Sequence, residues 1–356
     1  MGEAVLVFPA GMPDGLAFRD RARAAGLRVV GASSLERDPA ENGYEAWERL
    51  PYVNDPGFDA ALAELVRRHD IGAVHSPHHV VWKHLAERLD TIAPGARLTG
   101  GQPPQDIERA YRDLRERVAT LTAPGFASSH PGKPPLTALQ RAGLVRLVGT
   151  VPGMCGEDKM AAVMQVMRHA PPGDVVEIGS WWGRSAALLL WLARHYEVGK
   201  VLCVDPWSAE GLVQDEPMVD AASAEHDPEA ALRIFEINLV PLALGGLNYL
   251  RAPSVEGAAW YRLGQPLRTE AFGETEYAGR IAVLHIDGNH AEASVAADVE
   301  AWTPLVTPGG WIAFDDYEWA FGDGVRRVAD AFVHEHRDRI DCRFRGGPTL
   351  FVQLKR

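Results

Sequence analysis

The segment Val175-Val-Glu-Ile-Gly-Ser-Trp-Trp-Gly-Arg-Ser185 joins an apolar run to the start of a helical pattern through two glycines. Gly179 permits a tight turn, Gly183 lets the backbone approach a ligand closely, and Ser185 can cap the helix or contact the ligand. Asp205 ends the next apolar run, 22 residues after Gly183, where a carboxylate can accept hydrogen bonds from both hydroxyls of a ribose. Open α/β sheets bind adenosine-containing molecules at such turns. The segment therefore predicts an α/β domain that binds an adenosyl group.

The same turn favours a positively charged cofactor over one that carries phosphates. The nicotinamide fingerprint G-x-G-x-x-G is absent, because the turn contains only Gly179 and Gly183. Glu177 precedes the turn at the end of the expected strand. A carboxylate there repels phosphate and attracts the ammonium and sulfonium groups of S-adenosylmethionine. We therefore expect S-adenosylmethionine rather than NAD.

Two α/β domains are expected, because a chain of 356 residues is too long for one ordinary core. In residues 1–100, apolar runs alternate with helical patterns, which predicts a small parallel-sheet domain. Residues 101–150 indicate a helical connector, with a linker rich in proline and glycine at 122–135. Residues 151–356 return to the strand-helix-strand pattern and close with a strand-turn-strand signal at 340–354. The second domain should therefore end in an antiparallel hairpin.

Acidic residues end two expected strands of the second domain. Asp287 follows the apolar run 281–286, and Asp315 and Asp316 follow the run 311–314. One helical segment separates the two runs, so the strands should be parallel neighbours, about 5 Å apart. Three carboxylates at one sheet edge repel each other unless a hard cation lies between them, and oxygen ligands favour Mg²⁺, or else Mn²⁺ or Ca²⁺, over zinc. The pattern predicts a Mg²⁺ site.

His290 stands three residues after Asp287 in the stretch IDGNH. A histidine with a pKa near neutral can take the proton of a hydroxyl that a metal holds. Each residue also has an ordinary interpretation: Asp287-Gly-Asn suits a turn, Asp316 can cap a helix, and a lone histidine is more often solvated than catalytic. Only the joint spacing of these residues favours a metal site with a neighbouring base.

The segment Glu177–Ser185, with Asp205 and the terminal hairpin, resembles the class I S-adenosylmethionine-dependent methyltransferases over about residues 150–356. Trp181 stands where the family pattern has its middle glycine. In this departure the segment resembles one branch of the family, the metal-dependent sugar O-methyltransferases of macrolide biosynthesis and their relatives. That branch includes the proteins called cephalosporin hydroxylases. The resemblance implies a seven-stranded Rossmann-like sheet and places Ser254 beside the adenine. It implies the cofactor-binding residues Glu177, Gly179, Ser180, Trp181, Gly183, Ser185, Asp205 and Ser254, the metal ligands Asp287, Asp315 and Asp316, and the base His290.

Together these features predict a metal-dependent O-methyltransferase that acts on a hydroxylated small molecule, above all a sugar of a natural product or polysaccharide. A catechol or other phenol is the nearest alternative acceptor, since vicinal hydroxyls bind metal in both. An NAD-dependent oxidoreductase and a non-catalytic adenosyl-binding module are the alternatives from other classes. The domain of residues 1–100 resembles the small α/β domain that precedes ATP-grasp modules, and we expect it to shape the substrate entrance or an oligomer contact.

Composition and charge argue against other kinds of partner. The formal net charge is −12, and no block of lysine and arginine is interleaved with aromatics, which argues against nucleic acid. The stretch Met1–Pro9 lacks the basic region of a signal sequence and the length of a membrane span, so we expect a cytoplasmic protein without a membrane partner. Cys155, Cys203 and Cys342 form no C-x-x-C pair, which predicts reduced thiols. We expect a homo-oligomer.

Overall fold

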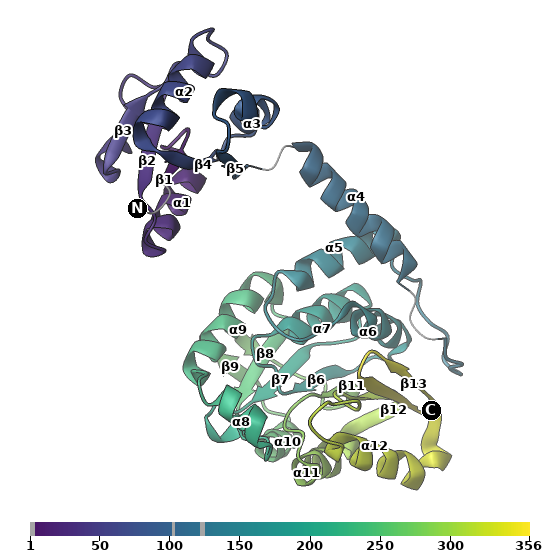
Figure 1. Ribbon diagram of the computed structural model, residues 1–356. Helices are drawn as coiled ribbons and strands as arrows, with labels where there is room; N and C mark the ends of the chain where they lie inside the picture. Colours follow the sequence, from purple (N-terminus) through teal and green to yellow (C-terminus); the bar gives the residue numbers. More distant parts are fainter. Residues whose placement is uncertain (1–3, 102–103, 122–124) are drawn as a thin grey trace. The chain divides into compact units, whose positions relative to one another are not determined.

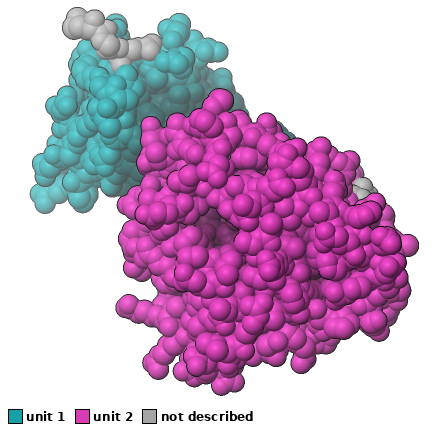
Figure 2. All heavy atoms as spheres, turned by 90° about the horizontal axis from the view of Figure 1, so that it is seen from below, with its two compact units in different colours: residues 1–114 teal, residues 115–356 magenta. Residues whose placement is uncertain are grey.

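The computed structural model describes residues 4–101, 104–121 and 125–356. The chain forms two compact units, Met1–Leu114 and Arg115–Arg356 (Figures 1 and 2). The division falls inside a single helix, α4. The three-part division at residues 100 and 150 stays a prediction. Residues 122–124 of the expected linker lie outside the described residues.

The N-terminal unit contains a five-stranded parallel sheet in the order β3-β2-β1-β4-β5. Its three central strands are the apolar runs of the sequence, and their side chains are almost all buried. The edge strands β3 and β5 are not predicted by the sequence, because they are four and three residues long and only partly buried. The elements are β1 (Ala4–Val7), α1 (Pro13–Ala24), β2 (Val29–Ser33), β3 (Ala46–Arg49), α2 (Phe58–His69), β4 (Ile71–His75), α3 (His79–Ile92), β5 (Arg97–Thr99) and the helix α4 (Pro104–Thr120) that leaves the unit.

The C-terminal unit contains a seven-stranded sheet in the order β13-β14-β12-β11-β6-β7-β8. Five strands are parallel, and the last two form the expected antiparallel hairpin against β12. The predicted α/β fold, with a seven-stranded sheet and a terminal hairpin, is confirmed. A separate short hairpin, β9 (Leu267–Thr269) with β10 (Gly273–Thr275), is not predicted by the sequence. The sheet strands are β6 (Asp174–Ile178), β7 (Val201–Asp205), β8 (Leu247–Arg251), β11 (Ile281–Ile286), β12 (Val306–Phe314), β13 (Ile340–Gly346) and β14 (Thr349–Leu354).

Helices cover both faces of this sheet, which explains why its central strands are buried at every position and are largely apolar, rather than apolar at alternate positions. All residues of β6 and β11 are buried. Helices α5, α6, α7 and α9 lie on one face, and α10, α11 and α12 lie on the other (Figure 1). The helices are α5 (Ala138–Gly149), α6 (Glu157–His169), α7 (Arg184–His195), α8 (Pro217–Ser223), α9 (Pro228–Ala243), α10 (Ser254–Arg262), α11 (Glu292–Trp302) and α12 (Gly324–Glu335).

The register of the parallel strands fixes which side chains meet at the carboxyl edge. Ile286 of β11 pairs with Phe314 of β12 on one side and with Ile178 of β6 on the other. Asp287 and Asp315 each follow one of these paired residues, so both begin at the same level of the sheet. The prediction that β11 and β12 are parallel neighbours is therefore confirmed.

No helix of the described residues is long and apolar enough to cross a membrane. The cytoplasmic location and the homo-oligomer stay predictions.

Candidate active site

A cavity of about 1050 Å³ opens at the carboxyl ends of the parallel strands in the C-terminal unit. This is the edge at which open α/β sheets bind their ligands. Its wall includes the glycine turn after β6, the end of β7 and the acidic ends of β11 and β12. The predicted site residues that line it are Gly179, Ser180, Trp181, Ser185, Asp205, Ser254, Asp287, His290, Asp315 and Asp316.

The turn after β6 requires glycine at position 179. Gly179 has a φ of +79°, and a Cβ atom placed there would lie 2.1 Å from the carbonyl oxygen of Asp287. No other residue fits this contact between the ends of β6 and β11. Gly183, with a φ of +90°, precedes α7 and lies outside the cavity wall. Gly179 thus shapes the backbone that lines the cavity, whereas Gly183 allows the left-handed turn before α7.

Trp181 also adopts a left-handed conformation, with a φ of +47°. Such a conformation costs a residue with a Cβ about 1–2 kcal/mol. Two hydrogen bonds hold it: its N–H donates to Asp205 Oδ2 at 3.0 Å, and its carbonyl accepts from Trp207 Nε1 at 3.0 Å. The indole ring consequently stands in the cavity wall, where it meets the ring of His226 edge to face at 5.1 Å.

Asp205 organises the glycine turn through backbone hydrogen bonds. Its carboxylate accepts from the N–H groups of Ser180 at 2.9 Å and of Trp207 at 2.8 Å, besides that of Trp181. Burial raises the pKa of Asp205, although these N–H donors act against the rise. Each carboxylate oxygen can accept more than one hydrogen bond, so Asp205 can still accept one from a ribose hydroxyl.

Glu177 lies behind the cavity wall rather than in it. It is fully buried, and its carboxylate accepts from Ser180 Oγ at 2.7 Å and lies 3.1 Å from His285 Nδ1. Burial raises the pKa of Glu177, but the hydrogen bond and charge of His285 outweigh it, so the pKa falls below its ordinary value. A direct contact with the cofactor stays a prediction. The contacts that the structure gives Glu177 position the turn and a buried histidine.

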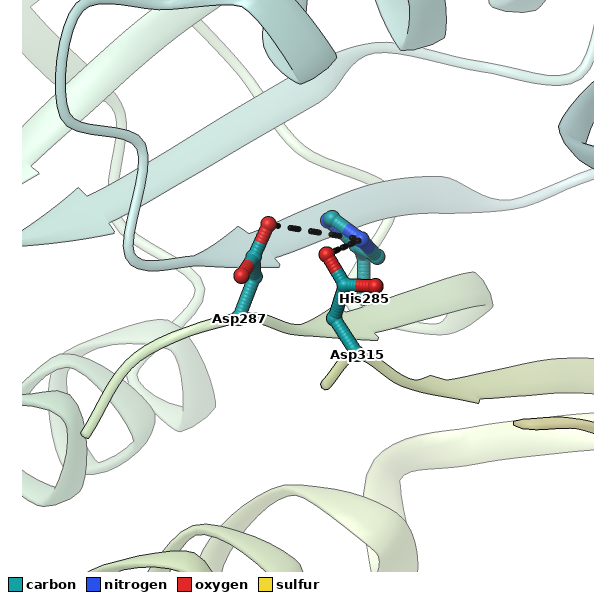
Figure 3. A group of neighbouring side chains, drawn as sticks. All are labelled: His285, Asp287 and Asp315. Carbon is teal, nitrogen blue, oxygen red and sulfur yellow. Dashed lines mark ion pairs between the residues drawn. The ribbon is translucent and has the colours of Figure 1, made fainter. Parts of the chain in front are cut away.

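Asp287 and Asp315 lie beside each other at the sheet edge, and each contacts the imidazole of His285 (Figure 3). His285 Nε2 lies 3.8 Å from Asp287 Oδ2 and 3.7 Å from Asp315 Oδ2, and it has no hydrogen-bond partner among the described residues. Thr349, at the start of β14, donates its hydroxyl to Asp315 Oδ1. The two carboxylates are thus brought together as the sequence predicts.

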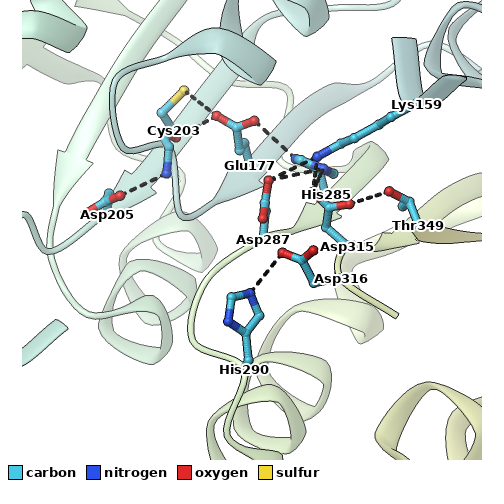
Figure 4. A network of polar contacts seen from close by, with 11 residues as sticks. Lys159, Glu177, Cys203, Asp205, His285, Asp287, His290, Asp315, Asp316 and Thr349 are labelled. Atoms are coloured by element: carbon cyan, nitrogen blue, oxygen red, sulfur yellow. Dashed lines mark hydrogen bonds and ion pairs between the residues drawn. The ribbon is translucent and has the colours of Figure 1, made fainter. Parts of the chain in front are cut away.

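Lys159 of α6 already supplies a positive charge to this pair (Figure 4). Its ammonium donates to Asp315 Oδ2 and, at 3.2 Å, to Asp287 Oδ2, while the side chain is only 2% exposed. Burial lowers the pKa of Lys159, but the charges of the carboxylates outweigh it and keep the pKa above its ordinary value. Both oxygens of Asp315 are therefore engaged by this chain's own donors.

Asp316 and His290 form a second group with Asp287, in which all three residues are partly exposed. His290 Nε2 lies 3.1 Å from Asp316 Oδ2, and Trp319 packs on the imidazole at 4.3 Å between ring centres. Burial raises the pKa of Asp316, but His290 outweighs it, and the pKa lies below its ordinary value. The other imidazole nitrogen, Nδ1, is buried without a partner among the described residues. His290 is therefore oriented by a carboxylate and has one nitrogen unused.

Residues 176–317 match the family model described as a methyltransferase domain. A curated relative from Streptomyces olivaceus, 8-demethyl-8-(2,3-dimethoxy-alpha-L-rhamnosyl)-tetracenomycin-C 4'-O-methyltransferase, is 26% identical over 66% of this chain and 87% of its own length. Mycinamicin III 3''-O-methyltransferase of Micromonospora griseorubida is also 26% identical, over 50% of this chain and 65% of its own length. Residues 176–317 of the C-terminal unit thus match a methyltransferase domain, and both of these curated relatives are O-methyltransferases. Among solved structures, the O-methyltransferase NovP is 19% identical, with a TM-score of 0.42 over 71% of this chain and 99% of its own.

Two residues of the candidate site are missed by the sequence analysis, Lys159 and His285. Lys159 lies on a helix whose residues from 159 to 164 are all buried, and a lysine at such a position is a signal that it has a charged partner. His285 is the one imidazole within the apolar strand β11. Lys159 lies 128 and 156 positions from its two carboxylate partners, and His285 lies 108 positions from Glu177, so only the fold brings these groups together.

Proposed function

We propose that the enzyme transfers the methyl group of S-adenosylmethionine to a hydroxyl of a sugar, on a natural product or a polysaccharide, with a divalent cation, Mg²⁺, as a second cofactor. The observation that carries this proposal is the pairing of His290 with Asp316, beside Asp287, in the wall of the cavity. The sugar is supported by the relative that is named for methylating a rhamnosyl-tetracenomycin.

The donor set fits a hard divalent cation at Asp287 and Asp316. One carboxylate oxygen of each and a nitrogen of His290 lie within 4.8 Å of one another. Carboxylate oxygens are the ligands that Mg²⁺ prefers. Asp315 was predicted as a third ligand, but both its oxygens accept from Lys159 and Thr349. We therefore assign the cation to Asp287 and Asp316, with Asp315 anchoring Lys159. A cation held there lowers the pKa of a hydroxyl beside it.

His290 is the group that takes the proton of the acceptor hydroxyl. Asp316 accepts a hydrogen bond from Nε2, which places the proton of the neutral ring on Nε2 and leaves Nδ1 as an acceptor. The packing of Trp319 keeps the ring in this orientation. S-Adenosylmethionine supplies an electrophilic methyl group, so the protein has to position and deprotonate the acceptor rather than activate the donor.

The segment between β7 and α9 contacts the loop that carries His290 and lines the cavity beside it. Gln214 Oε1 accepts from the backbone N–H of His290 at 2.8 Å, and Asn289 donates its side-chain amide to the carbonyl of Val213. Val219 and Ser223 of α8 line the same cavity. This segment would exclude water while the acceptor is bound.

A methylation assay with three acceptors and S-adenosylmethionine, read by mass spectrometry, tests the proposal. The acceptors are a rhamnosylated aromatic polyketide, its aglycone and catechol, each with Mg²⁺ and with EDTA. We expect a methylated glycoside, loss of product in EDTA and recovery with added Mg²⁺. Methylation of catechol alone would overturn the sugar assignment, and full activity in EDTA would overturn the role of the cation.

A further inference from the structure

His285 lies between the two halves of the candidate site, and the proposed chemistry gives it no role. The register of the sheet places it opposite Glu177 of β6, and Asp287 follows two positions later on the same side of the extended chain. The imidazole is 2% exposed. Its Nδ1 lies 3.1 Å from Glu177 Oε1, whereas its Nε2 lies 3.8 Å from Asp287 Oδ2 and 3.7 Å from Asp315 Oδ2 (Figure 4). One buried ring therefore contacts carboxylates on both of its sides.

On one side of the ring, hydrogen bonds lead from Glu177 to the backbone of the glycine turn. The carboxylate of Glu177 accepts from Ser180 Oγ at 2.7 Å, and the N–H of Ser180 donates to Asp205 Oδ2 at 2.9 Å. The same oxygen of Asp205 accepts from the N–H of Trp181 at 3.0 Å. A displacement of Glu177 is therefore passed to the turn that lines the cavity beside Asp205.

On the other side of the ring, the contact with the acidic pair is incomplete. His285 Nε2 is buried and has no hydrogen-bond partner among the described residues, although most buried polar side-chain atoms have one. The ammonium of Lys159 donates to the same two oxygens, Asp287 Oδ2 and Asp315 Oδ2, that face this nitrogen. Both oxygens lie just beyond hydrogen-bond distance of Nε2. A small shift of Asp287 therefore alters its contact with the ring.

We infer that His285 is a positioning residue that couples the cation site to the cofactor site. A cation on Asp287 fixes the imidazole, and the imidazole fixes Glu177 and the glycine turn, so the cation and the adenosyl ligand bind cooperatively. Ordering the shared ring costs free energy, which the first ligand supplies and the second does not supply again. Such coupling is reciprocal, because each ligand raises the affinity for the other by the same factor. The inference rests on the proposed cation and adds to it an effect on the cofactor.

The test measures both halves of the coupling in the full-length protein. The dissociation constant of S-adenosylhomocysteine is measured by calorimetry with Mn²⁺ and with EDTA, and that of Mn²⁺ by electron paramagnetic resonance with and without S-adenosylhomocysteine. The proteins are the wild type, His285→Asn, His285→Leu and the control His334→Asn, which makes the same change at an exposed position of α12. The amide of His285→Asn can still donate to Glu177 from the place of Nδ1, but nothing replaces Nε2. His285→Leu removes both contacts.

We expect each ligand to strengthen binding of the other at least about fivefold in the wild type and in His334→Asn. In both His285 variants this factor should fall below about twofold, while His285→Asn in EDTA binds S-adenosylhomocysteine within about threefold of the wild type, because its turn keeps the donor to Glu177. Coupling that persists in either His285 variant, or that is absent from a wild type that binds both ligands, would overturn the inference and leave the proposed cation in place. A wild type that binds no Mn²⁺ would overturn the proposed cation and the inference with it.

Discussion

Replacement of Asp298 by asparagine should stabilise the ligand-free enzyme in a manner that depends on pH. Burial raises the pKa of Asp298 from 3.8 to about 6, and each pKa unit corresponds to about 1.4 kcal/mol, so the charged form costs about 3 kcal/mol of folding free energy. Because the pKa of Asp298 is raised in the folded state, the wild type loses about 3 kcal/mol of folding free energy as the pH rises from about 4 to 6. Above pH 6 the loss stays constant. Asparagine carries no charge, so the variant does not lose this free energy.

The measurement is urea unfolding of the wild type and Asp298→Asn without ligand at pH 5, 6, 7 and 8. The variant should be more stable at pH 7 and 8 by up to about 3 kcal/mol, and the difference should shrink at pH 5. The control Glu300→Gln should follow the wild type at every pH, because its carboxylate is exposed in both states. A variant that is no more stable at pH 8, or whose advantage is the same at pH 5, would refute the reasoning.

Three further substitutions probe the cavity wall and the acidic cluster. His290→Ala should lower the rate of methyl transfer at least about 100-fold, while the affinity for S-adenosylhomocysteine in calorimetry stays within about twofold. Lys159→Met keeps the buried volume but leaves Asp287 and Asp315 without their ammonium, so the free energy of unfolding should fall by about 3–5 kcal/mol. Added Mg²⁺ should restore part of the lost stability, measured by thermal unfolding. Gly179→Ala should abolish binding of S-adenosylhomocysteine, since its Cβ would lie 2.1 Å from a carbonyl oxygen.

For each of these three predictions, one outcome would contradict the reasoning. Methyl transfer at the wild-type rate in His290→Ala would remove the histidine from the proposed chemistry. A Lys159→Met protein as stable as the wild type, with no response to Mg²⁺, would mean that the ammonium does not compensate the two carboxylates. Normal ligand binding by Gly179→Ala would show that the turn can move away from β11.

The strand ends of the C-terminal unit could be predicted because apolar runs and the residues after them are local features of the sequence. Asp287 and Asp315 each follow such a run, and the short helical connection between the runs makes their strands neighbours. The short strands β3, β5, β9 and β10 could not be predicted in this way. Each is three or four residues long and at most partly buried, so its pairing depends on the neighbouring chain rather than on its own pattern.

The contacts that decide the role of each acidic residue could not be predicted from spacing. Asp315 was expected to be a metal ligand, but the fold brings Lys159 to it from 156 positions away. Asp298 stands three residues after the buried Val295 and four before the buried Trp302, on the apolar face of its helix. That position is a local signal of a buried carboxylate, but its direction toward the cavity depends on Ser254 from another helix.

Binding of Mn²⁺ in the presence of S-adenosylhomocysteine, followed by electron paramagnetic resonance, tests the central proposal most directly. Wild type, Asp316→Asn and the exposed control Glu300→Gln are titrated with the ion. The account predicts one tightly bound ion per chain in the wild type and the control, with affinity at least about tenfold weaker in Asp316→Asn, because that variant removes one of the two carboxylate ligands. Absence of a bound ion in the wild type, or equal affinity in all three proteins, would contradict it.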